Sequence, residues 1–256
     1  CADACFVPND ERNALCTGIG TTLLVMTATA ERDSQLPSEL LGQAENYLRT
    51  KGAKVLYAGG IYPLNAFYLG LYGGSELPGV MDKDPLRTLL ESSDYQRIDS
   101  VAILQCNLRS FRPVVSREVR QLRREFKFEE ISDPPLENWW QACTIGDFTR
   151  LGYRLVSRGA AEPLASVWFW DVDPLSSAWG QRAAGLCDLY VDPEHRRRGL
   201  ATALLGEALK QLRLRGVTLI EAQSMQQNEP ALSLYGKLGF TVVDGGAVFR
   251  KQTSQS

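Results

Sequence analysis

The sequence predicts an α/β protein with a mixed sheet, built from two tandem units of one fold. First, the 256 residues are 44% hydrophobic and 23% charged, the composition of an ordinary globular chain long enough for two modest domains. Second, residues 41–52 recur as residues 205–216. Third, each copy has helical spacing, ends at a glycine and leads into a short β-rich run.

The repeat consists of two blocks in the same order. LGQAENYLRTKG at 41–52 matches LGEALKQLRLRG at 205–216, with six of twelve positions identical at an offset of 164. Asn65 followed by Leu71–Tyr72 then matches Asn228 followed by Leu234–Tyr235 at an offset of 163. Two ordered blocks with nearly equal offsets argue against chance and favour two homologous units.

In the first half, the patterns predict a strand over Thr21–Thr29, a helix over Leu40–Lys51, and strands over Lys54–Ala58 and Ser100–Gln105. Proline and charged segments then interrupt the pattern within 110–135. We therefore expect a first domain at 1–112, a linker with a charged helix at 113–135, and a second domain at 136–256.

In the second half, alternating apolar residues predict strands over Ala165–Trp170 and Ala184–Val191. Asp192–Pro193 ends the second strand, and Gly199 precedes a helix over about 200–215, which leads into a strand over Val217–Ala222. The first amides of a helix lack partners within it and lie at the positive end of its dipole. A strand, a glycine turn and a helix start therefore indicate a phosphate site.

The motif Arg196-x-x-Gly199-x-Ala201 after a strand, followed by the segment from Asn228 through Tyr235 to Phe240, resembles the GNAT N-acetyltransferase superfamily over about 129–252. The resemblance implies acetyl-CoA as cofactor, with its pyrophosphate on the turn and its pantetheine along the preceding strand. It implies Tyr235 as the general acid that protonates the leaving thiolate, although a core aromatic is the alternative for this residue. The implied cofactor-binding residues are Leu189, Tyr190, Val191, Arg196, Arg197, Arg198, Gly199, Leu200, Ala201, Thr202, Asn228 and Tyr235.

The acceptor amine must be neutral to attack a thioester, so the reaction calls for a base or a water chain. Asp188 and Glu221 are the candidate carboxylates. Some family members carry Glu directly before this Asp, where the chain has Cys187, and this departure leaves the base open between the two. We interpret Cys187 as a small buried residue.

The first half lacks the turn. The offset of 164 places Arg32 opposite Arg196, Gln35 opposite Gly199 and Pro37 opposite Ala201. A side chain at the closest approach to an anion and a proline without an amide N–H both oppose phosphate binding. We expect this half to be a degenerate copy that serves as a structural partner or a substrate wall.

Charge and composition limit the classes of partner that we expect for this protein. A net charge of −2 gives no basic surface for nucleic acid, no apolar run approaches a membrane span, and His195 is the single histidine. We expect no metal, and a small-molecule or peptide amine as acceptor of an N-acetyltransferase that is a monomer or homodimer. Six cysteines without a Cys-x-x-Cys pair suit the cytoplasm.

Two further expectations stay open at this point. A non-catalytic CoA-binding or protein-interaction module with the same fold is the alternative function. The first half also has few residues before its helix, which predicts that the first domain is incomplete here and that the natural protein extends N-terminally by some tens of residues.

Overall fold

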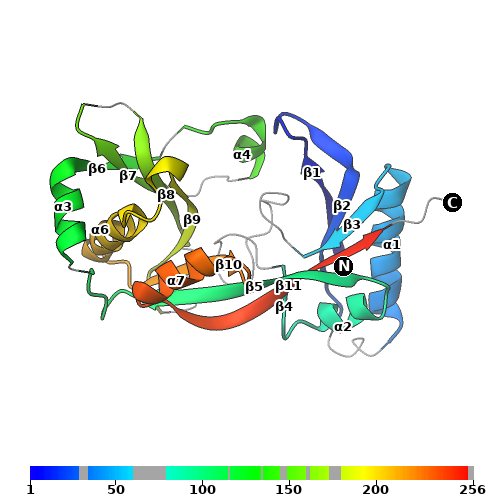
Figure 1. The fold of residues 1–256 in the computed structure, drawn as a ribbon. Coiled ribbons are helices and arrows are strands. Elements are labelled where there is room, and N and C mark those ends of the chain that lie inside the picture. Colours follow the sequence, from blue (N-terminus) through cyan, green and yellow to red (C-terminus); the bar gives the residue numbers. More distant parts are fainter. Residues whose placement is uncertain are drawn as a thin grey trace.

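A computed structural model describes residues 1–28, 34–59, 79–114, 116–133, 135–144, 149–159, 162–172 and 180–252. Its described strands form one mixed sheet in the order β1-β2-β3-β11-β5-β10-β9-β8-β7-β6, with β4 attached to β11 (Figure 1). The strands are β1 Ala2–Pro8, β2 Leu15–Val25, β3 Val55–Ala58, β4 Val80–Met81, β5 Gln96–Asn107, β6 Phe126–Ser132, β7 Arg150–Ser157, β8 Pro163–Asp171, β9 Ala183–Val191, β10 Leu219–Met225 and β11 Thr241–Gln252. The helices are α1 Leu36–Thr50, α2 Pro85–Glu91, α3 Arg117–Glu125, α4 Trp139–Thr144, α6 Leu200–Leu214, α7 Glu229–Lys237 and the 3-10 turn η2 Pro193–His195.

The predicted α/β class with a mixed sheet is confirmed, and the repeat is visible in three dimensions. Helices α1 and α6 have the same length and bounds at the offset of 164. Each follows one strand and leads into a second strand that pairs with the first in parallel. The parallel pairs also obey the offset: Ile19↔Val55, Gly20↔Leu56 and Thr21↔Tyr57 correspond to Ala183↔Leu219, Ala184↔Ile220 and Gly185↔Glu221.

The two halves exchange strands at the centre of the sheet. β5, from the first half, lies between β10 and β11 of the second half. β11, from the second half, lies between β3 and β5 of the first. The predicted division into 1–112 and 136–256 therefore runs through a shared sheet, and each half completes the hydrogen bonding of the other.

The segment assigned to a linker, 113–135, contains regular structure. Ser116 caps α3 by accepting a hydrogen bond from the Val119 amide at 3.2 Å. β6 follows α3 directly and pairs with β7 along its whole length. We propose that the second unit begins near residue 116, because a strand of the sheet cannot belong to a free linker.

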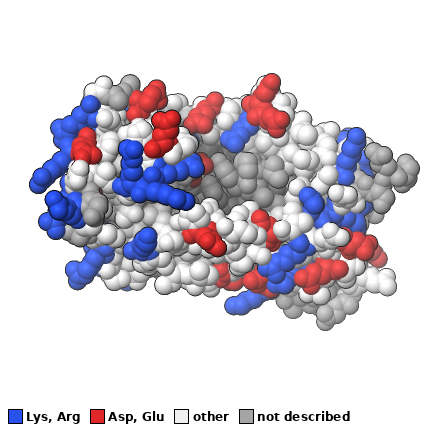
Figure 2. All heavy atoms as spheres, in the orientation of Figure 1, with Lys and Arg blue, Asp and Glu red and all other residues white. Residues whose placement is uncertain are grey.

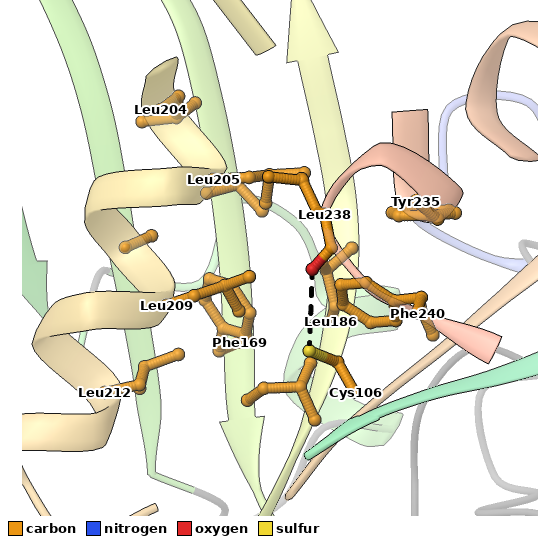
Figure 3. Packing of buried hydrophobic residues seen from close by; sticks show 14 of the residues in the cluster. Cys106, Phe169, Leu186, Leu204, Leu205, Leu209, Leu212, Tyr235, Leu238 and Phe240 are labelled. Carbon is orange, nitrogen blue, oxygen red and sulfur yellow. Dashed lines mark hydrogen bonds between the residues drawn. The ribbon is translucent and has the colours of Figure 1, made fainter. Parts of the chain in front are cut away.

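Each half also contributes a buried side chain to the core of the other. Cys106 of β5 lies among Leu186, Leu238 and Phe240 in the second-half core (Figure 3), and burial raises the pKa of its thiol to about 11. Its Sγ donates to the Leu238 carbonyl oxygen at 3.8 Å. Phe249 of β11 is fully buried in the first-half core with the apolar face of α1. Both apolar burial and hydrogen bonding therefore stabilise the exchange of strands between the halves.

The first-half core contains one buried carboxylate, on α1. Glu45 is 3% exposed and pairs with Arg49 at 2.5 Å and with Lys251 of β11 at 3.2 Å. By the offset of 164 its position corresponds to the buried Leu209 of α6. The ion pair ties the exchanged strand to the helix of the other half.

A second bridge between the halves lies away from the sheet centre. The Trp140 amide of α4 donates to the Arg12 carbonyl oxygen in the turn between β1 and β2 at 3.1 Å, and Figure 1 shows α4 beside that hairpin. No helix among the described residues is long and apolar enough to span a bilayer.

Candidate active site

A cleft opens where β9 and β10 separate. The two strands pair in parallel only from Ala183↔Leu219 to Gly185↔Glu221, although both continue beyond this point. A bulge in β9 accompanies the separation, with Asp188 at a φ of 47° and a register shift against β8. The cleft holds about 360 Å³ and is lined by Val101, Leu186, Cys187, Asp188, Leu189, Gln223, Ser224, Met225, Asn228, Ala231 and Tyr235.

The corresponding strands of the first half stay together for longer. β2 and β3 form one more pair, Thr22↔Ala58, and the Gly59 amide then donates to the Thr22 carbonyl oxygen at 2.9 Å. β3 is therefore hydrogen-bonded to β2 along its whole length, and the two strands do not separate within β3 as β9 and β10 do.

The turn that follows β9 is held by its own side chains. The Asp192 carboxylate accepts from the Glu194 amide at 2.8 Å and lies 3.2 Å from His195 Nδ1, and these contacts lower the pKa of the Asp192 carboxyl, that with His195 most. The Arg196 Nε donates to the Val191 carbonyl oxygen at 3.1 Å. One arginine of the predicted phosphate site therefore also fixes the shape of the turn.

The end of the turn presents backbone donors. Arg197 and Gly199 both have left-handed backbone, at φ of 62° and 81°, and α6 starts at the next residue. Consecutive amides in such a conformation, followed by the unpaired amides of a helix start, form a concave anion site. Arg197 and Arg198 are exposed, and Figure 2 shows basic side chains gathered over this end of the second half.

Gly199 is required by its backbone conformation. A Cβ there would lie 3.6 Å from the Leu122 Cδ1, an ordinary contact, so space within the protein does not exclude a side chain. Its φ of 81° favours glycine instead, because a residue with a Cβ adopts left-handed backbone only at a cost.

The equivalent position of the first half is different. Gln35 precedes α1 with right-handed helical backbone, at a φ of −74°, and Pro37 lies in the first turn of the helix. Arg32 and the segment from Asn65 to Tyr72 lie outside the described residues. The geometry at Gln35 agrees with our interpretation of a degenerate copy, and the loss of cofactor binding there stays a prediction.

Two α7 residues predicted for the site line the cleft. Asn228 caps α7, accepting from the Ala231 amide at 3.3 Å. Tyr235 is 5% exposed, borders the cleft and lies 5.2 Å from Phe240 between ring centroids (Figure 3). The tyrosine is therefore a core aromatic that also borders the cleft, and its role as general acid stays a prediction.

The two candidate bases occupy contrasting environments. Asp188 is exposed at the bulge and lines the cleft. Glu221 is 2% exposed at the last parallel pair before the strands separate, and burial raises the pKa of its carboxyl to about 8. A carboxyl with such a pKa is suited to exchange protons near neutral pH.

The pantetheine-binding residues proposed from the sequence lie between the cleft and the turn. Leu189 lines the cleft, while Tyr190 and Val191 pair with Ser166 and Ala165 of β8 as β9 approaches the turn. β9 thus connects the cleft to the turn that the sequence predicts as a phosphate site.

Sequence reasoning missed two glutamines. Gln105 of β5 donates through its Nε2 to the Glu221 Oε2 at 2.9 Å. Gln223 follows Glu221 by two residues on β10 and borders the cleft, and its buried Oε1 has no hydrogen-bond partner in the described part of the chain. Strand alternation could have indicated Gln223, whereas Gln105 is reached only through the strand exchange.

The structure thus combines a mixed sheet, a cleft between diverging parallel strands, and a turn with left-handed backbone that leads into the start of α6. Residues 116–240 match the family model of the acetyltransferase (GNAT) family, and this part of the chain belongs to the GNAT superfamily.

Curated relatives match short segments. An uncharacterized N-acetyltransferase of Methanocaldococcus jannaschii is 31% identical over 70 residues, 27% of this chain and 31% of the relative. The [ribosomal protein bS18]-alanine N-acetyltransferase of Escherichia coli K12 is 39% identical over 57 residues, 22% of this chain and 38% of the relative. The matched part therefore spans about a third of these relatives' length.

Solved structures match nearly the whole chain in fold. A glucosamine N-acetyltransferase region in a fungal multi-domain β-N-acetylglucosaminidase has a TM-score of 0.69 at 17% identity, covering 98% of this chain and 31% of that one. A tandem GNAT protein from the clavulanic acid biosynthesis pathway has a TM-score of 0.66 at 15% identity, covering 93% and 76%. The tandem GNAT fold thus extends over both halves.

No group of three His, Cys, Asp or Glu side chains that could hold a metal ion occurs among the residues that the structure describes. Cys187, Asp188 and Tyr235 are the titratable side chains that line the cleft, and the buried Glu221 lies two residues before the cleft-lining Gln223 on β10.

Proposed function

We propose that the chain is an N-acetyltransferase that moves an acetyl group from acetyl-CoA to a primary amine by direct attack. When bound, acetyl-CoA supplies the thioester that the amine attacks. The single observation that carries the proposal is the course of β9, which runs from the cleft at Leu186–Leu189 into the turn that ends at Gly199, where α6 begins. One extended cofactor can therefore occupy both sites.

The residues present fit this cofactor. The backbone donors around Gly199 and the exposed Arg197 and Arg198 suit a pyrophosphate, because donors and positive charge converge there. β9 offers extended backbone, and the separated strands leave room for a pantetheine arm. Thr202 and Ala201 lie in the first turn of α6, where small side chains leave the amides accessible.

Glu221 is the proposed base. Its carboxylate takes a proton from the acceptor ammonium, and the neutral amine then forms the new C–N bond as the C–S bond breaks. Tyr235 gives its proton to the departing thiolate and regains one, through water, from the nitrogen of the new amide, while Glu221 releases its proton to solvent. We prefer Glu221 to Asp188 because its buried carboxyl has a pKa of about 8, close to the pH at which an amine must be deprotonated.

The test measures acetyl transfer from acetyl-CoA to a panel of amines and N-terminal peptides, with thiol release as the readout. We expect kcat/KM to rise with pH through about 8, and Glu221→Gln to remove this dependence together with most of the activity. Tyr235→Phe should lower kcat about 10²-fold or more with a smaller effect on KM.

The outcomes also separate the alternative function. Binding of CoA without turnover on any amine would favour a non-catalytic CoA-binding module. Full activity of Glu221→Gln would instead return the role of base to Asp188 or to a water chain, and full activity of Tyr235→Phe would leave that side chain as a core aromatic.

A further inference from the structure

The first half of the chain places a polar side chain against Glu221, the proposed base of the second half. Gln105 lies on β5, the strand that the first half inserts between β10 and β11. It stands directly opposite Glu221 in the antiparallel register and donates from Nε2 to the Glu221 Oε2 at 2.9 Å.

The hydrogen bond from Gln105 gives the two oxygens of the Glu221 carboxylate different environments. Oε2 is held by Gln105, whereas Oε1 is buried and has no hydrogen-bond partner among the residues that the structure describes. Two residues further along β10, the buried Gln223 Oε1 is likewise without a partner. Buried oxygens of this kind cost free energy unless a donor reaches them, so their presence next to the cleft points to a ligand with N–H groups.

We propose that Gln105 is a positioning residue, which holds the Glu221 carboxylate so that its Oε1 faces the nitrogen of the acceptor amine. The inference rests on the proposed function and extends it, because it makes the first half a part of the active site. The amide must present its NH₂ group to Glu221, since an amide oxygen would repel an ionised carboxylate.

Apart from Gln105, few side chains near Glu221 can affect the pKa of its carboxyl. The in-register neighbours of Glu221 are Gly185 on β9 and Gln105 on β5, neither of which is charged. The titratable side chains that line the adjacent cleft are Cys187, Asp188 and Tyr235. Burial raises the pKa of Glu221 and the hydrogen bond from Gln105 lowers it, and no charged group of the described chain is among the causes.

The role of Gln105 therefore has a pH signature. Gln105→Leu removes the donor and keeps the approximate volume, so the ionised carboxylate loses its hydrogen bond and the pKa that governs kcat/KM moves upward. A charge-assisted hydrogen bond of ordinary strength corresponds to a shift of about one pH unit. At pH 7, kcat/KM should fall about tenfold, and most of the loss should disappear by about pH 10.

The experiment compares pH profiles of the full chain, Gln105→Leu and Gln121→Leu. Gln121 is the matched control, because its Nε2 also donates to a glutamate, the Glu125 Oε1 at 2.8 Å, on the exposed face of α3. This control should keep the profile of the parent chain. A structural lesion at Gln105 would lower kcat/KM by the same factor at every pH, which would overturn the proposal.

A second measurement does not depend on turnover. The pH dependence of urea unfolding reports the same carboxyl, and Gln105→Leu should extend the loss of stability to a pH about one unit higher. Unmoved profiles in both assays, with Glu221→Gln inactive, would refute the role of Gln105 and leave the proposed function standing. Activity of Glu221→Gln equal to the parent chain would refute the assignment of the base, and with it this inference.

Discussion

The substitution Glu221→Gln makes a quantitative test of the buried carboxyl. The folded-state pKa of about 8 lies above 4.5, the ordinary value of a glutamate carboxyl, so between these values the folded chain retains a proton there that the unfolded chain has lost. The stability associated with the protonated carboxyl is complete below about pH 4.5 and decreases as pH rises through about 8. The neutral amide of glutamine does not have this dependence.

The size of the effect follows from the same pKa. Each unit of difference is worth about 1.4 kcal/mol, so the full interval sets a ceiling of about 5 kcal/mol. Relaxation and water entry in the ionised form reduce this value, and a few kcal/mol is the realistic expectation. Between pH 5 and pH 7.5, the free energy of unfolding of the variant should rise by about 2–3 kcal/mol relative to that of the parent chain.

Urea unfolding followed by tryptophan fluorescence at several pH values measures this difference. Glu125→Gln, which removes an exposed carboxyl on α3, serves as the control and should run parallel to the parent chain. A constant difference between Glu221→Gln and the parent from pH 5 to pH 9 would refute the argument, because the carboxyl would then have the same pKa in the folded and unfolded chains.

Three further predictions concern the turn and the exchanged strands. Gly199→Ala should lower stability by about 1 kcal/mol and weaken CoA binding, because alanine opposes the left-handed backbone. The control Gly206→Ala lies inside α6, where the added Cβ has no neighbour within 4 Å, and it should be neutral or stabilising. Calorimetry of both variants compares their stability and CoA binding. Titration of CoA should give one site per chain, and a second equivalent site would show that the first half has kept its function. The fragments 1–112 and 113–256, produced separately, should not unfold cooperatively, because β5 and β11 each need strands of the other half. The two fragments should associate when mixed. Two independently stable fragments would contradict the importance of the strand exchange.

Local sequence determined the elements around the turn. The helix predicted over about 200–215 is α6 at Leu200–Leu214, and the strand predicted over Ala184–Val191 is β9 at Ala183–Val191. Apolar spacing, a terminal glycine and strand alternation are local signals, and these elements obey them because they are buried on one face. The repeat offset predicted the equivalence of α1 and α6 for the same reason.

Other elements escaped the local signals. β1 at Ala2–Pro8 was not predicted, and β2 occupies Leu15–Val25 in place of the expected Thr21–Thr29, whose last residue lies outside the described chain. β6 combines alternation with charged residues and was assigned to a linker. Strands near the edges of a sheet are partly exposed, so their hydrophobic pattern is weak and their partners decide their extent.

The sequence by itself determined that this chain has two related α/β units, that one of them carries the acetyltransferase motifs, and which residues surround the turn. Only the tertiary structure decided how the units are joined. Pairing across the sheet depends on residues more than a hundred positions apart, such as Gln105 and Glu221, and no local pattern reports such a contact. The burial that raises the pKa of Glu221 likewise arises from packing around it, so the environment of the proposed base is a property of the assembled sheet.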